Sequence, residues 1–173
     1  NLSIIPANIT LAGAEFELVD AENREMRFKT AIDKIKDNYD YIIIDCPPSL
    51  GLLTINALVA SDGVTVPMLC EYFSLEGLTQ LMITIREVKK RFNQRLELTG
   101  IIITMYNGRL NLSAEVLREL KKYYSDKLFK TMIPRSVRLS EAPSYGEPIQ
   151  YYDRKSKATE AYSDLVNELL ARI

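Results

Sequence analysis

The chain has 173 residues, of which 47% are apolar and 26% charged, a composition typical of one medium globular domain with its own hydrophobic core. It contains no histidine, which excludes Ser-His-Asp and Cys-His hydrolases, histidine-ligated zinc and imidazole acid–base chemistry. No uninterrupted apolar run approaches the roughly 18 residues of a membrane span, so we expect a soluble protein without membrane contact. The two cysteines, Cys46 and Cys70, lack metal-ligand or CxxC spacing and are expected to be buried free thiols in a reducing cytoplasm.

The net charge of −1 hides an uneven distribution along the chain. Residues 1–85 carry 5 basic and 12 acidic residues, and residues 139–173 carry 4 and 6. Residues 86–138 carry 13 basic and 5 acidic residues, a local charge of +8. This basic segment either forms a surface that binds a polyanion or consists of solvated helix faces; the sequence alone favours neither alternative.

Apolar segments that suit buried strands alternate with amphipathic helical patterns along the whole chain. The alternation predicts an α/β fold, with a doubly wound, mostly parallel sheet flanked by helices, in a single domain spanning residues 1–173. In chain order we expect a strand at 2–5, helices at 12–19 and 24–37, a strand at 41–44, a helix at 50–60, a strand at 64–69, a helix at 74–92, a strand at 100–104, a helix at 111–124, a strand at 128–133 and a helix at 156–173.

For three of these elements the sequence also predicts burial or capping at individual residues. Tyr41–Ile44 is apolar at every position, as expected of a strand covered on both faces. Either Asn111 or Ser113 is expected to cap the helix at 111–124. The core face of the last helix is expected to comprise Ala161, Leu165, Val166, Leu169 and Leu170.

The strongest chemical signal is Asp45, which directly follows the apolar run at 41–44. Parallel sheets bind ligands at the carboxyl ends of their strands, and a carboxylate there can hold magnesium against nucleotide phosphates. The alternative is that Asp45 only caps a turn, a common position for aspartate. Pro47 and Pro48 stiffen the loop that follows and favour the metal-site interpretation.

The stretch from Tyr39 to Leu58, YDYIIIDCPPSLGLLTINAL, resembles the ParA/Soj family of chromosome and plasmid partition ATPases. Further stretches resemble the same family in the same order: residues 4–7 and 11–15, 70–78, 133–144, and 152–153 with 160–162. The resemblance therefore covers the whole chain, and it implies a P-loop NTPase-like fold and Mg-dependent ATP hydrolysis in the full-length family.

The resemblance implies roles for individual residues. Asp45 matches the Walker B aspartate that organises magnesium, and the following switch II segment, which senses the γ-phosphate, comprises Cys46, Pro47, Pro48 and Ser49. The adenine pocket of the family matches Thr104, Met105, Pro134 and Arg135. Arginines that bind DNA non-specifically match Arg109 and Arg138, and both lie in the basic segment 86–138.

The resemblance also implies cofactors and partners. The full-length family uses ATP or ADP with magnesium, forms a homodimer in its ATP state, and binds nucleoid DNA and a ParB-type partition protein. The implied location is the bacterial cytoplasm, associated with the nucleoid. A MinD-like membrane role is disfavoured, because the tail 167–173 carries little positive charge.

One departure from the family is large. None of the seven glycines belongs to a GxxxxGK[ST] or Gly-Gly-x-Gly-Lys motif, and the chain starts with Asn1 rather than Met. Without the backbone amides and lysines of such a loop, we expect this chain alone neither to bind ATP tightly nor to hydrolyse it. It is then either the C-terminal portion of a ParA/Soj-like ATPase that lacks the N-terminal strand and P-loop, or a non-catalytic α/β module that binds DNA or a protein partner through the basic 86–138 face.

Overall fold

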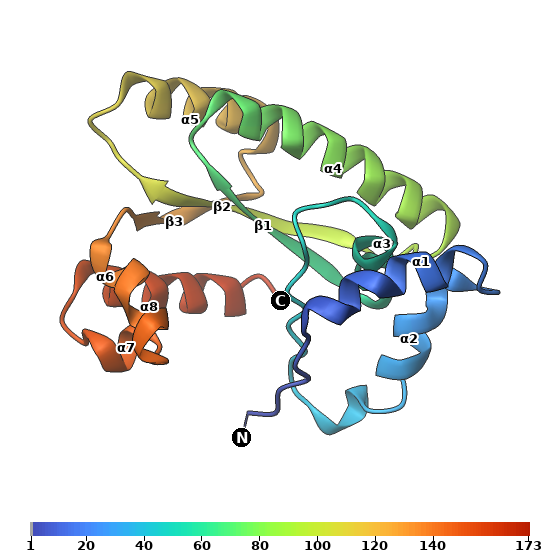
Figure 1. The fold of residues 1–173 in the computed structure, drawn as a ribbon. Coiled ribbons are helices and arrows are strands. Elements are labelled where there is room, and N and C mark those ends of the chain that lie inside the picture. The colour runs from blue at the N-terminus through green and yellow to red at the C-terminus, as the bar shows by residue number, and fades with distance from the viewer. Residues whose placement is uncertain (1) are drawn as a thin grey trace. The chain divides into compact units, whose positions relative to one another are not determined.

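The computed structural model describes residues 2–173, which fall into two units (Figure 1). Unit 1 contains the residues up to Asp62 together with Leu81–Glu97, and unit 2 contains Gly63–Gln80 together with Leu98–Ile173. The long helix α4 (Tyr72–Arg91) belongs partly to each unit.

Unit 1 is built from short helices. They are the 3-10 helices η1 (Ile9–Gly13), η2 (Arg24–Met26) and η3 (Lys36–Asn38), the α-helices α1 (Ala14–Val19), α2 (Arg27–Ile32) and α3 (Leu52–Ala60), and the second half of α4. The helix predicted at 24–37 is therefore broken into η2, α2 and η3, whereas α3 and α4 lie where the sequence predicts them.

Helix α3 is the centre of unit 1, because most of its residues are buried. The Asn56 side chain is only 3% exposed and uses all of its hydrogen-bonding groups. Its amide nitrogen donates to the carbonyl oxygens of Arg24 and Leu52, both at 2.9 Å, and its oxygen accepts from the Phe28 N–H at 3.1 Å. One buried amide thus ties α3 to the segment that contains η2 and α2.

Two predicted strands of unit 1 do not form. Residues 2–5 and 41–44 have no regular secondary structure, and Ile43 is 91% exposed. Strands require backbone partners, and no strand within residues 2–173 pairs with either segment. For the same reason Cys46 is exposed rather than buried, although it is a free thiol, as is the half-buried Cys70.

Unit 2 contains a three-stranded sheet with the order β1-β2-β3, made of β1 (Gly63–Leu69), β2 (Glu97–Tyr106) and β3 (Leu128–Pro134). The strand pair β2–β3 is parallel. Helix α5 (Asn111–Tyr124) lies on one side of these strands (Figure 1). On the other side lie α6 (Val137–Glu141), η4 (Ala142–Tyr145), α7 (Ile149–Tyr152) and α8 (Lys157–Leu170). The doubly wound α/β prediction is confirmed.

One hydrophobic cluster of unit 2 joins β2 and β3 to α8. Phe129 is fully buried and clusters with Ile102, Ile133 and Leu165. Ser156 caps α8 by accepting a hydrogen bond from the Thr159 N–H.

Two details predicted for the helices of unit 2 are wrong. Val166 and Leu170 are each 48% exposed, because the buried stripe of α8 runs through residues 158, 161, 165 and 169 and leaves these two beyond its border. Helix α5 has Leu110 at its N-cap, without a side-chain cap, so neither Asn111 nor Ser113 caps it.

Strand β3 is irregular near its middle, where its register with β2 shifts between the pairs Ile101–Leu128 and Ile103–Met132. The Glu168 carboxylate of α8 accepts there from the N–H groups of Lys130 and Thr131, at 2.8 and 2.9 Å. Burial of this carboxyl raises its pKa, but these bonds and the Arg172 guanidinium outweigh burial and lower the pKa of Glu168 to about 2.

This lowered pKa predicts acid sensitivity. The stability that Glu168 contributes is fully present above its unfolded pKa of 4.5 and is lost as the pH falls toward 2. We therefore expect the free energy of unfolding to fall between pH 5 and pH 2 more steeply in the wild-type chain than in Glu168→Gln, measured by urea denaturation followed by circular dichroism. Parallel pH profiles of the two proteins would contradict the assignment.

Candidate nucleotide and nucleic-acid site

The four residues predicted for the adenine pocket lie together at the carboxyl ends of β2 and β3. Thr104 and Met105 are near the end of β2, and Pro134 ends β3. Tyr106 pairs with Pro134 in the sheet register, and the Arg135 N–H donates to the Tyr106 carbonyl oxygen at 3.5 Å. Unit 2 thus brings together residues that are 30 positions apart, at the sheet edge where α/β folds bind ligands.

Within this group Thr104 and Met105 have different structural roles. The Thr104 hydroxyl donates to the Met68 carbonyl oxygen of β1 at 3.3 Å, so it stabilises the sheet. Met105 is 61% exposed and adopts a left-handed backbone with φ of 50°, in the part of β2 whose register with β3 shifts. Met105 is therefore not part of the core. A methionine at positive φ is uncommon, and such strain is concentrated at functional sites.

Two substitutions of Met105 distinguish the effect of backbone strain on stability from the effect of losing the side chain. Asparagine tolerates the left-handed conformation, so Met105→Asn is expected to raise the free energy of unfolding by about 0.5–1 kcal/mol. The control Met105→Ala keeps a strained backbone and should bring no gain. Urea denaturation followed by circular dichroism measures both variants, and equal gains in the two would refute the backbone explanation.

Arg109 lies in the loop that connects β2 to α5. Its N–H donates to the Asn107 side-chain oxygen at 3.1 Å, and the Leu110 N–H donates to the Asn107 carbonyl oxygen at 3.2 Å. The loop is therefore a tight turn organised by Asn107. Arg109 is exposed and forms no ion pair within residues 2–173, so its guanidinium is available to an anion.

Arg138 lies in α6 and has acidic neighbours that the sequence did not reveal. Its Nη1 is 3.0 Å from a Glu141 carboxylate oxygen, and its Nε is 3.5 Å from an Asp153 oxygen. The same Glu141 oxygen accepts from the Tyr152 hydroxyl at 3.0 Å. The hydrogen bond to Glu141 raises the pKa of Arg138. Glu141, Asp153 and Tyr152 lie in or beside stretches that carry the family resemblance. That resemblance is the only feature of the sequence that points to these residues.

Asp45 and the predicted switch II residues belong to unit 1, whereas the residues predicted for the adenine pocket belong to unit 2. Residues 45–49 are exposed and have no helix or strand. The Thr54 hydroxyl of α3 donates to the Ser49 carbonyl oxygen at 2.6 Å and anchors the end of the segment. Desolvation of the sulfur and the neighbouring Asp45 carboxylate raise the pKa of the Cys46 thiol.

The amino end of α3, next to this segment, carries an acidic cap. The Glu15 carboxylate of α1 accepts from the Leu53 N–H at 3.3 Å. A Cβ on Gly51 would come within 2.1 Å of that carboxylate, so glycine leaves room for the cap. The cap neutralises helix-end N–H groups and fixes where the segment enters α3.

The basic segment 86–138 is divided between the two units. In unit 1, Lys89 pairs with Glu97, and Arg91 pairs with Glu87 at 3.0 Å. Residues 98–138, in unit 2, carry 8 basic and 3 acidic residues, whereas residues 86–97, in unit 1, carry 5 and 2, so the larger positive charge lies in unit 2. The part of the segment in unit 2 is therefore the better candidate for binding polyanions.

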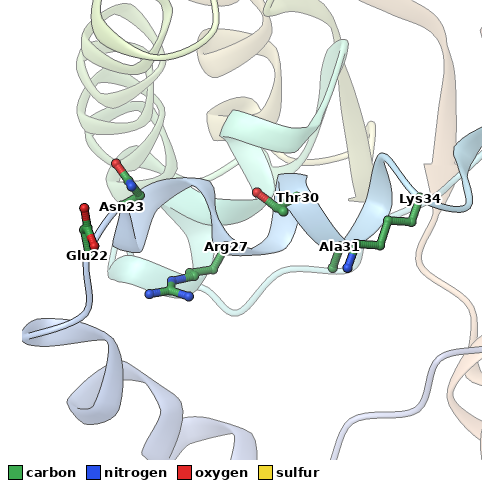
Figure 2. Close-up of a pocket in the computed structure, with 6 residues that line it drawn as sticks. All are labelled: Glu22, Asn23, Arg27, Thr30, Ala31 and Lys34. Carbon is green, nitrogen blue, oxygen red and sulfur yellow. The ribbon is translucent and has the colours of Figure 1, made fainter.

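The structure also has a shallow depression of about 370 Å³ on unit 1 (Figure 2). Its lining residues are Glu22, Asn23, Arg27, Thr30, Ala31 and Lys34. None of them is a predicted site residue, and the depression is wide open to solvent, so it is not part of the candidate site.

Within residues 2–173, no group of three or more Cys, Asp or Glu side chains is arranged to hold a metal ion. No helix in this range is both long enough and apolar enough to cross a membrane.

The parallel strands flanked by helices define a doubly wound α/β protein, and comparison with known proteins narrows the class. Residues 1–98 match the family model described as an AAA domain. The chain is 58% identical to the sporulation initiation inhibitor protein Soj of Bacillus subtilis, over 99% of this chain and 68% of that protein. It is 50% identical to the chromosome partitioning protein ParA of Myxococcus xanthus, over 99% of this chain and 60% of that protein.

A solved structure agrees in fold. Cobyrinic acid a,c-diamide synthase from Mycobacterium smegmatis, with bound ADP and magnesium, matches with a TM-score of 0.78 and 37% identity, over 95% of this chain and 60% of that one. The chain belongs to the Soj/ParA family of chromosome-partitioning ATPases. It spans 60% to 68% of the length of the two curated relatives.

Proposed function

We propose that this chain carries the magnesium-organising, nucleobase-binding and DNA-binding residues of a bacterial chromosome or plasmid partition ATPase. The identity to partition proteins, 58% and 50%, exceeds the 37% identity to the diamide synthase and favours partition over that chemistry. The observation that carries the proposal is the shared location of two sets of residues. The end of β2 holds Met105 and the loop after it holds Arg109, and the segment after β3 holds Arg135 and Arg138.

This arrangement connects nucleotide binding to DNA binding within unit 2. A nucleobase seated at the strand ends would contact the same two segments that carry the arginines, so it would restrict their movement. Arginine side chains outside a recognition helix bind phosphates without reading base sequence. Nucleotide occupancy would therefore change non-specific DNA affinity, as a partition protein requires.

The residues present also fit magnesium and the phosphates in part. Magnesium in phosphate sites uses one or two carboxylates together with waters and phosphate oxygens, and Asp45 is an exposed carboxylate of this kind. When bound, the ion neutralises charge on the phosphates. Asp45 would hold the ion directly or through water, and residues 46–49 would respond to the γ-phosphate. A ParB-type partner, an ATP-dependent homodimer and association with the nucleoid follow from the same proposal.

The DNA-binding part of the proposal is tested by two substitutions. Arg109→Ala and Arg138→Ala each remove one phosphate contact, so each is expected to weaken binding about threefold to tenfold and to reduce the slope of log affinity against log salt by about one. Fluorescence anisotropy with a labelled 30-base-pair duplex measures both effects. Arg154→Ala, an exposed arginine outside the basic segment, is the control. Unchanged affinity in both variants would overturn the DNA assignment.

A further inference from the structure

Arg109 and Arg138 differ in how available they are to a phosphate. Arg109 has no acidic partner within residues 2–173, whereas Arg138 faces two carboxylates at once, from Glu141 on its own helix and from Asp153 after α7. The Arg138 Nη1 donates to Glu141 at 3.0 Å, and Asp153 forms an ion pair with the Nε atom at 3.5 Å. A DNA phosphate would have to compete with both.

The Glu141 carboxylate is held in place from the far side. Its Oε2 atom accepts from the Tyr152 hydroxyl as well as from Arg138, both at 3.0 Å. The Tyr152 ring stacks on Tyr145, with centroids 5.2 Å apart and planes at 29°. Glu141 therefore has a second hydrogen-bond donor besides Arg138, which helps to hold the carboxylate beside the guanidinium.

We propose that Glu141 and Asp153 restrain Arg138 and thereby lower the affinity of unit 2 for DNA. The inference rests on the proposed DNA binding and adds a regulatory element to it. The Arg138 and Glu141 side chains are 57% and 39% exposed, so the pair is screened by solvent and weak enough to open. The two carboxylates weaken the contact between Arg138 and a DNA phosphate, but they do not prevent it. Any movement of α6 away from α7 would release the arginine and strengthen binding.

The test removes charge without removing volume. Glu141→Gln keeps an oxygen that can accept from Tyr152 but no longer neutralises Arg138. Asp153→Asn does the same at the second partner and leaves intact the Asp153 carbonyl, which accepts from the Ser156 and Thr159 hydroxyls. Each variant is measured in the 173-residue chain by anisotropy with the same duplex at several NaCl concentrations. Circular dichroism verifies that each variant is folded.

Glu141→Gln is expected to tighten binding about threefold at low salt, because the phosphate contact of Arg138 becomes stronger when Glu141 no longer competes for the guanidinium. The gain must disappear when Arg138→Ala is added, so that Glu141→Gln/Arg138→Ala binds as Arg138→Ala alone. Asp153→Asn should show a smaller gain with the same dependence. Glu147→Gln removes an equal charge from an exposed carboxylate without an ion pair to Arg138, and it is the control for a general charge effect.

Each result has one meaning. If the gain persists in the Arg138→Ala background, or Glu147→Gln matches it, the carboxylates act through overall charge and the inference is wrong. If Glu141→Gln leaves affinity unchanged or weakens it while Arg138→Ala still lowers it, the restraint fails but the proposed DNA binding stands. If neither Arg109→Ala nor Arg138→Ala lowers affinity, the proposed DNA binding itself fails.

Discussion

Arg172→Ala is expected to destabilise unit 2 by about 2–4 kcal/mol, because it removes three part-buried hydrogen bonds to backbone carbonyl oxygens together with the contact on Phe129. The Arg172 guanidinium donates to the carbonyl oxygens of Thr99, Lys127 and Leu128 at 3.3, 3.1 and 2.9 Å. It also lies 3.9 Å from the centroid of the fully buried Phe129 ring. These carbonyls belong to the region where β2 meets the beginning of β3, so the loss affects the sheet directly.

Urea denaturation followed by circular dichroism measures this loss, and amide hydrogen exchange of β3 locates it. Arg118→Ala is the matched control, because Arg118 is exposed on α5 in the same unit; its effect should be within about 0.5 kcal/mol. Arg172→Lys keeps the charge but not the planar set of donors, so it should recover less than half of the loss. A wild-type stability in Arg172→Ala would show that the carbonyls find water instead.

Asn56→Ala is expected to destabilise unit 1 by about 2–3 kcal/mol. The substitution leaves the Phe28 N–H and the Arg24 carbonyl without their partner at a position that is 3% exposed. Asn56→Asp preserves the volume but directs a carboxylate at two carbonyl oxygens, so it should cost at least as much. The same chemical denaturation measures both variants.

The comparison of these two variants separates hydrogen bonding from packing. If Asn56→Asp is well tolerated while Asn56→Ala is not, the contribution of Asn56 comes from filling space. Asn38→Ala is the control in the same unit, because Asn38 is exposed and its side chain forms no hydrogen bond within residues 2–173. Its effect should stay within about 0.5 kcal/mol.

The sequence predicted a helix or strand correctly where the elements that pack against it or pair with it lie near it along the chain. Strands β1, β2 and β3 and helices α3, α4, α5 and α8 all lie within a few residues of their predicted ranges. The strand predicted at 41–44 does not form. An apolar run shows that a segment could be a buried strand, but it does not show that a partner strand lies beside it. Helices α6 and α7 have five and four residues, too few for a helical period to be visible.

The sequence predicted some features of the candidate site and missed others. The resemblance identified Met105 and Pro134, and the fold then brought their strand ends together. The left-handed backbone of Met105 could not be predicted, because no glycine, asparagine or aspartate marks the position. The restraint on Arg138 was also hidden, since Asp153 reaches it from a different helix and the pairing exists only once α6 and α7 have folded.

Helix α4 has a practical consequence for anyone who dissects this protein. The chain enters unit 2, returns to unit 1 and enters unit 2 again, with one of the boundaries inside α4 between Gln80 and Leu81. No single cut of the chain releases either unit intact. Division at that boundary leaves helical pieces of 9 and 11 residues, shorter than the about 12–15 residues that an isolated helix needs in water. The separate roles of the two units are therefore best examined by point substitutions rather than by truncation.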